Sequence, residues 1–149
     1  MKILISSEHA GYELKMNLVD HLSSRGFEVE QSGATSSEST DYPPIIEDAS
    51  LRVAGGEFDL GIFICGTGIG VSLAACKIPG TTVALVTNSY MARMAREHNN
   101  ANVLCLGSRV VGLDHAKDIV DTFLNGSFEG GRHTRRLVQV QEIERRYRR

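Results

Sequence analysis

Apolar and polar residues follow two distinct periods along this chain. Short, continuous apolar runs are typical of buried strands, whereas apolar residues three or four apart, such as Leu14, Leu18 and Leu22, indicate amphipathic helices. The runs predict strands at residues 3–6, 27–30, 60–64, 82–86 and 103–106. The amphipathic stretches predict helices at residues 11–25, 41–53, 72–77, 90–98, 113–124 and 133–147.

Strands that alternate with helices predict right-handed crossovers and one parallel sheet. We therefore expect an α/β fold: a single-domain, doubly wound (Rossmann-like), five-stranded parallel sheet with helices on both faces. The last helix follows Gly130-Gly131 and leads to no strand, so we expect it to pack on a partner subunit. Ligands of such sheets bind at the carboxyl ends of the strands, where residues 6–9, 65–70 and 107–109 fall.

The junction after the third strand carries the most specific chemistry. Cys65 ends the apolar run, and Gly66, Gly68 and Gly70 follow at alternate positions. Glycines permit a tight turn and let several N–H groups approach one ligand beside the positive end of a helix. Three roles are open for this segment alone: a phosphate or nucleotide cradle, a reactive thiol, or simple packing of a small side chain. A Walker A loop is excluded, because no Gly-Lys-Ser/Thr follows.

Composition narrows the classes of partner. The formal net charge of −2 argues against a nucleic-acid partner. Cys65, Cys76 and Cys105 form no zinc-ligand spacing, so we expect no metal, reduced thiols and a cytoplasmic location, with Cys76 and Cys105 in the core. The apolar run at residues 3–5 is too short for a signal-peptide core or a membrane span, so no membrane association is expected.

Six short segments share the order and spacing of a known family, and they extend over essentially the whole chain. They are Glu8-His9-Ala10-Gly11, Asp41-Tyr42-Pro43, Cys65-Gly66-Thr67-Gly68-Ile69-Gly70, Arg96-Glu97-His98-Asn99-Asn100-Ala101-Asn102, Gly107-Ser108-Arg109-Val110-Val111-Gly112 and Glu129-Gly130-Gly131-Arg132-His133. On these segments the chain resembles the sugar-phosphate isomerases, the family that includes ribose-5-phosphate isomerase B and galactose-6-phosphate isomerase.

The resemblance implies one sugar-phosphate isomerase domain over residues 1–149. Its expected activity is the interconversion of two phosphorylated sugars, ribose 5-phosphate and ribulose 5-phosphate, through a cis-enediolate. It also implies that neither a metal nor an organic cofactor takes part. The expected assembly is a homodimer or a dimer of dimers, with active sites shared between subunits.

The resemblance further implies roles for particular residues. Cys65 matches the base that moves a proton between C2 and C1, and His98 matches the residue that opens the sugar ring. The cradle for the enediolate is matched by Thr67 and by the amides of Gly66, Gly68, Ile69 and Gly70. Further substrate contacts are matched by Glu8, His9, Asn99 and Arg109, and the phosphate-binding arginines by Arg132 and Arg136. These residue types suit the reaction, which needs a base, oxyanion donors and a group that titrates near neutral pH.

One position departs from the family pattern. Glu8 stands where the family usually has aspartate, and its extra methylene moves the carboxylate outward. Because site geometry must be held to within ~0.5 Å, this change leaves two other sugars open as substrates, a hexose 6-phosphate and a tetrulose 4-phosphate. A non-catalytic module that binds sugar phosphates or nucleotides is the alternative from another class of protein.

Overall fold

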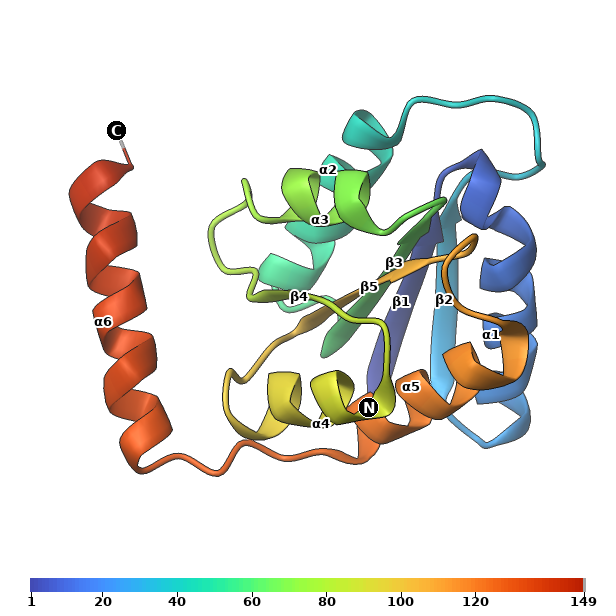
Figure 1. Cartoon of the computed structure of the whole chain (residues 1–149). Coiled ribbons are helices and arrows are strands. Elements are labelled where there is room, and N and C mark those ends of the chain that lie inside the picture. Colours follow the sequence, from blue (N-terminus) through green and yellow to red (C-terminus); the bar gives the residue numbers. More distant parts are fainter. Residues whose placement is uncertain (149) are drawn as a thin grey trace.

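A computed structural model describes residues 1–148 and shows one five-stranded parallel sheet with the strand order β2-β1-β3-β5-β4 (Figure 1). The strands are β1 (Lys2–Ser7), β2 (Glu28–Gly33), β3 (Leu60–Cys65), β4 (Val83–Leu85) and β5 (Val103–Gly107). The helices are α1 (Tyr12–Ser24), α2 (Tyr42–Ala54), α3 (Ile69–Ala75), α4 (Ser89–Glu97), α5 (Leu113–Asn125) and α6 (Arg132–Tyr147), with a short 3-10 turn, η1 (His9–Gly11), before α1. Within these residues, no helix has both the length and the apolar character needed to cross a membrane.

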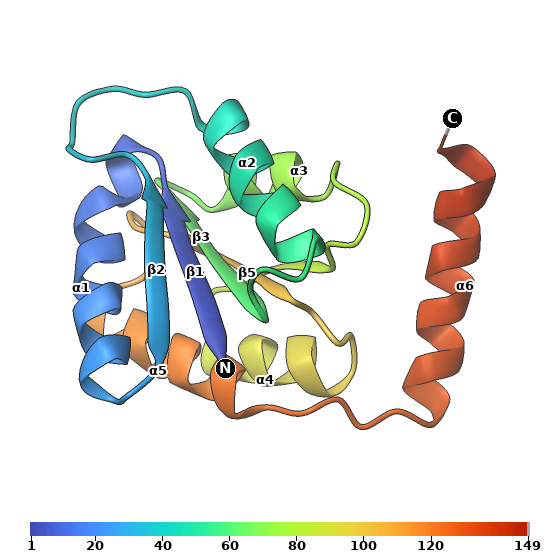
Figure 2. The same ribbon diagram turned by 180° about the vertical axis from the view of Figure 1, so that it is seen from behind.

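Two apolar layers hold the sheet between helices. On β1, Ile3 and Ile5 pack against α1, α4 and α5, whereas Leu4 packs against α2 and α3. Successive side chains of a strand point to opposite faces, so one apolar run serves both layers. Figures 1 and 2 show the two groups of helices on opposite faces of the sheet. The expected doubly wound fold is therefore confirmed.

The element boundaries differ from expectation most clearly after Cys65. The sequence predicts that the following helix begins at Ser72, but α3 begins at Ile69. Gly68 adopts φ +78°, and a Cβ there would lie 2.5 Å from Leu85 Cδ1. This glycine turns the chain within three residues of the strand end, so the helix begins directly after it. β2 also runs further than expected, to Gly33, because it pairs with β1 along its whole length.

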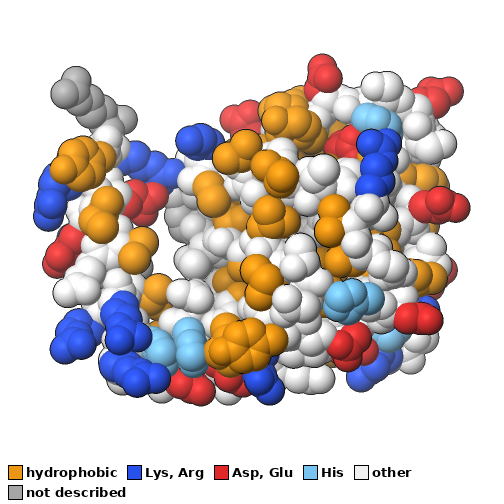
Figure 3. Space-filling model, in the orientation of Figure 1, with side chains coloured by type: hydrophobic (Ala, Val, Ile, Leu, Met, Phe, Trp, Pro, Cys, Tyr) orange, Lys and Arg blue, Asp and Glu red, His pale blue; other side chains and the backbone are white. Residues whose placement is uncertain are grey.

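The last helix, α6, stands apart from the sheet and its covering helices (Figures 1 and 2). A cleft of about 530 Å³ lies between α6 and the body, lined by Thr82, Val83, Leu137, Val140 and other residues. Val140 (60% exposed) and Ile143 (55% exposed) line this cleft from α6 and remain largely exposed within it. Figure 3 shows apolar side chains on this helix. The packing of α6 on a partner subunit remains a prediction.

Candidate functional site

The first group of expected site residues lies at the carboxyl edge of the sheet, where β1, β3 and β5 end side by side. The strand register aligns Ser7 with Ile64 and Cys65 with Gly107. Backbone hydrogen bonds then tie the loops together: Ser108 N donates to Cys65 O (2.9 Å), and Arg109 N donates to Gly66 O (3.0 Å). The segments that carry Glu8, Cys65 and Arg109 are thus fixed relative to one another by the sheet.

Cys65 ends β3, the strand between β1 and β5, and so lies in the middle of this edge. Its side chain is buried (6% exposed), and its Sγ accepts a hydrogen bond from Gly68 N at 3.1 Å. Thr67 lies in the same turn, where its Oγ1 accepts from Ile69 N at 3.2 Å. The turn therefore holds the Cys65 thiol against one backbone amide, that of Gly68, at the end of β3.

The other two cysteines have different surroundings. Cys105 is fully buried in β5, and burial raises the pKa of its thiol well above the ordinary value. The expectation that Cys76 lies in the core is wrong: it is exposed, because it caps the C-terminus of α3 beyond the last buried turn. Partial desolvation still raises the pKa of the Cys76 thiol, with an opposing effect from Lys77. Neither thiol is set up to ionise near neutral pH.

Glu8 and His9 form a second feature of the same edge. One carboxylate oxygen of Glu8 accepts from Gly11 N (3.1 Å) and caps η1, and the other lies 2.7 Å from His9 Nδ1. His9 N donates to Thr40 Oγ1 (3.2 Å), and its Nδ1 also lies 3.2 Å from Thr40 N. Thr40 N is the donor of the second contact, so His9 Nδ1 lies between a backbone donor and the Glu8 carboxylate. Both oxygens of Glu8 are therefore engaged within the protein.

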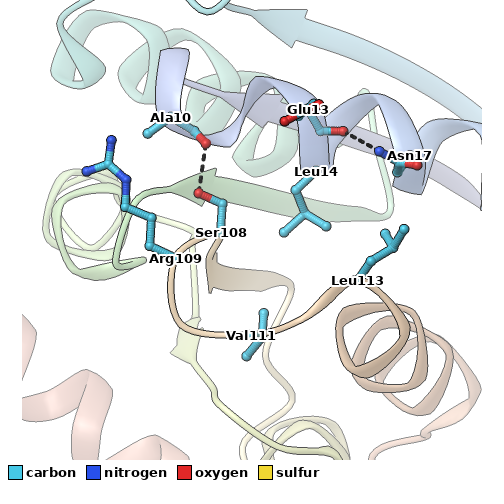
Figure 4. A pocket seen from close by; sticks show the side chains of 8 residues that line it. All are labelled: Ala10, Glu13, Leu14, Asn17, Ser108, Arg109, Val111 and Leu113. Atoms are coloured by element: carbon cyan, nitrogen blue, oxygen red, sulfur yellow. Dashed lines mark hydrogen bonds between the residues drawn. The ribbon is translucent and has the colours of Figure 1, made fainter.

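Arg109 borders this edge on the side of the β5–α5 loop. Its side chain lies over the backbone of Gly66, where a Cβ would meet Arg109 Nη1 at 3.3 Å. A cavity of about 460 Å³ lies behind it, between the start of α1 and the β5–α5 loop (Figure 4). Ser108 Oγ donates to Ala10 O (2.7 Å) in the cavity wall, and the Arg109 guanidinium extends away from Leu14 and Leu113 (Figure 4). Cys65 does not line this cavity, so the cavity lies beside the thiol and not around it.

Lys15 supports the carboxyl edge and was missed by sequence reasoning. It is fully buried, and its Nζ donates to the carbonyls of Ser32 (2.9 Å) and Ala34 (2.6 Å). Burial lowers the pKa of Lys15. Its two acceptors lie at the start of the loop that carries Thr40 to His9, so the ammonium anchors that loop. The signal was weak, since a lysine in an amphipathic helix ordinarily indicates the solvated face.

The second group of expected residues lies elsewhere in the chain. His98 and Asn99 directly follow α4, and Arg132 and Arg136 lie exposed at the start of α6. His98 stacks on His133, with ring centroids 4.0 Å apart and an interplanar angle of 14°. Burial, together with the nearby charges of His98, Arg132 and Arg136, lowers the pKa of His133, and Glu129 opposes the shift.

The structure does not bring the two groups together within one chain. Cys65 pairs with Gly107 at the carboxyl end of β5, whereas His98 precedes the amino end of that strand. The strand itself rises roughly 13 Å over its length. Glu8, His9, Thr67, Cys65 and Arg109 therefore share one edge of the sheet, and His98, Asn99, Arg132 and Arg136 share the other.

The thiol of Cys65 thus lies in a glycine turn at the carboxyl edge of a doubly wound α/β sheet, the edge at which proteins of this fold class bind their ligands. The sequence profile described as "Ribose/Galactose Isomerase" matches residues 3–140, and the chain belongs to this family. The resemblance inferred from the six segments is thereby confirmed.

Individual relatives agree over nearly their full length. The chain is 49% identical to the ribose-5-phosphate isomerase B of Escherichia coli strain K12, over 97% of each chain. The ribose-5-phosphate isomerase B of Clostridium thermocellum shares its fold with a TM-score of 0.96 and 55% identity, over 99% of each chain. The enzyme of that name from Mycoplasma genitalium, solved with bound ribulose-5-phosphate, has a TM-score of 0.91 and 42% identity, over 97% of this chain and 96% of its own.

Proposed function

We propose that this protein is an aldose–ketose isomerase that interconverts ribose 5-phosphate and ribulose 5-phosphate. The observation that carries the mechanism is the hydrogen bond from Gly68 N to Cys65 Sγ at the end of β3. The full-length likeness to ribose-5-phosphate isomerases B, one of them with ribulose-5-phosphate bound, supports the choice of sugar. The free thiols of all three cysteines favour a reducing compartment, the cytoplasm.

Cys65 is the proposed base. The thiolate removes the proton from C2 of the open-chain aldose and returns it to C1, which needs a base within reach of both carbons. Negative charge develops on the substrate oxygens of the enediolate. The backbone amides of the turn beside Thr67 are proposed to stabilise that charge. Folding has already oriented them, so they need no rearrangement when the charge forms. Glu8, His9 and Arg109 border the turn and are proposed to contact the sugar.

The remaining groups are proposed to come from a partner subunit. His98 opens the sugar ring, and Arg132 and Arg136 bind the phosphate with Asn99 beside them. Two observations support sharing: these residues lie at the opposite edge of the sheet from Cys65, and both arginines are exposed at the start of α6. Guanidinium groups bind phosphate through two parallel hydrogen bonds, so an exposed pair one helical turn apart suits this ligand.

The surroundings of Glu8 bear on the other candidate sugars. Its carboxylate caps η1 and contacts His9, so the extra methylene is absorbed inside the protein. This favours the pentose phosphate over a hexose 6-phosphate or a tetrulose 4-phosphate.

A panel of four-, five- and six-carbon sugar phosphates, followed by NMR for isomerisation, tests the assignment. We expect the highest kcat/KM on ribose 5-phosphate. A higher kcat/KM on a four- or six-carbon sugar phosphate would change the assigned substrate but leave the assigned reaction unchanged. Equilibrium binding without turnover of any member would favour a non-catalytic binding module.

A further inference from the structure

His133 is the one buried residue of α6, whose other side chains from Arg132 to Tyr147 are exposed or half-buried. It is 5% exposed, and its ring lies flat against the ring of His98. Simple anchoring of a helix would be served by an apolar side chain. The use of an imidazole at this contact therefore indicates a task besides packing.

Glu129 is the third side chain of this cluster, beside His133 and His98. Its Oε2 lies 3.4 Å from His133 Nε2 and 3.8 Å from His98 Nε2, so both rings turn the same nitrogen toward one carboxylate oxygen. A backbone hydrogen bond holds the loop of Glu129 beside the end of α4, because Glu129 N donates to Glu97 O at 3.0 Å, directly before His98 in the chain. The positions of all three side chains are thus set by the junction between α4 and α6.

The arrangement does not suit a metal ion. The lone pair of an imidazole nitrogen lies in the ring plane, and the two planes are nearly parallel and separated by the stack. An ion between the two Nε2 atoms would lie well outside both planes. The stack instead suits packing of one ring on the other: burial lowers the pKa of His133, so His133 presents a neutral ring to His98, and the Glu129 carboxylate lies near enough to offset a proton that His98 gains.

We propose that His133 and Glu129 are positioning residues for His98, with His133 holding the ring by stacking and Glu129 stabilising it when it carries a proton. The proposal rests on the ring-opening role given to His98 above. In that step the C1–O bond to the ring oxygen breaks, the C1 hydroxyl loses a proton and the ring oxygen gains one. His98 takes the first proton and gives the second, so the enzyme's proton count is unchanged. Between these transfers His98 is an imidazolium, the state that Glu129 stabilises.

Nitrogen NMR of the protein labelled with ¹⁵N-histidine tests the positioning without substrate. The chain has five histidines, so single substitutions can assign each signal. We expect Glu129→Ala and His133→Ala to change the ring ¹⁵N shifts of His98, which report the protonated nitrogen. Glu142→Ala, at an exposed glutamate further along α6, is the matched control and should leave them unchanged.

Kinetics connect the positioning to turnover. Glu129→Ala should lower kcat about 2- to 5-fold, as expected for a partly exposed charge pair. His133→Ala should lower kcat about 2- to 10-fold, and His133→Phe, which keeps a stacking ring, should recover part of that loss. KM should stay within about twofold in each, because the substrate contacts are untouched.

Unchanged His98 shifts in both alanine variants would overturn the proposal, as would changed shifts with wild-type kcat. A wild-type protein that isomerises no sugar phosphate would instead overturn the proposed function. It would leave the NMR result readable, so the two failures are distinguishable.

Discussion

The two edges of the sheet differ in how complete they are. At the carboxyl edge, Cys65, Glu8 and His9 each have a hydrogen-bond or ion-pair partner from their own chain, and Cys65 and Glu8 are buried. At the opposite edge, Arg132 and Arg136 extend into solvent at the start of α6, where blue side chains gather in Figure 3. Folding thus gives the candidate residues of the carboxyl edge partners within the chain, whereas at the opposite edge His98 has such neighbours and the two arginines are exposed.

The sharpest test of the carboxyl edge is removal of the Cys65 thiol. Cys65→Ala should lower kcat by about 10²- to 10⁴-fold, the range for loss of an acid–base group, with phosphate binding retained. Steady-state turnover of ribose 5-phosphate, with product followed by NMR, measures this loss. Cys76→Ala is the matched control, since that thiol is exposed and remote from the turn. Near-normal turnover in Cys65→Ala would show that another group is the base.

The relation between the edges is tested by subunit exchange. Cys65→Ala protein and Arg132→Ala/Arg136→Ala protein should each be inactive, and mixing them with exchange should restore activity. A mixed dimer with shared sites has one site with both defects and one with neither. Exchange is followed by mass spectrometry of the intact assembly, and turnover is measured on the same sample. If exchange occurs and activity stays absent, the two edges serve the same chain.

Arg136→Ala tests the opposite edge of the sheet by itself. Loss of a charge-assisted contact costs about 1.5–3 kcal/mol, so KM should rise roughly 10- to 100-fold with a smaller change in kcat. Arg135→Ala is the matched control, because it lies in the same turn of α6 and is offset from the face shared by Arg132 and Arg136. Equal effects of the two substitutions on KM would indicate a diffuse positive field instead of a defined phosphate site.

The smallest expected effect concerns Lys15, which supports the carboxyl edge. Lys15→Met keeps the buried stem but leaves the carbonyls of Ser32 and Ala34 without their donor, at a cost of about 1–3 kcal/mol in unfolding free energy. Because the freed loop carries Thr40, KM should also rise a few-fold. Urea unfolding and steady-state kinetics measure the two effects, with Lys77→Met at an exposed position as the control. Unchanged KM with lowered stability would show that Lys15 acts on the fold alone.

The sequence predicted the five strands and the helices α1 to α6, but not the short 3-10 turn η1. Buried apolar runs and helical spacing carried the prediction in elements such as β3 and α5, whereas α6 buries only His133. The turn at Cys65 was also predictable, since the glycines follow a strand directly. The start of α3 was not, because only Gly68's contact with Leu85 reveals how sharply the chain turns there. The surroundings of His98 were equally hidden: Glu129 lies in a loop without periodicity, and His133 reads as one polar residue in a polar helix.

Because the proposed sites are shared between subunits, and His98 lies before β5, activity should depend on protein concentration. A newly folded chain carries every reacting group and still forms no product, because the strand between its two edges keeps them apart. Only an encounter with a second chain creates a working site. At high dilution the rate per chain should then fall as the partners separate, and recover on concentration without any refolding.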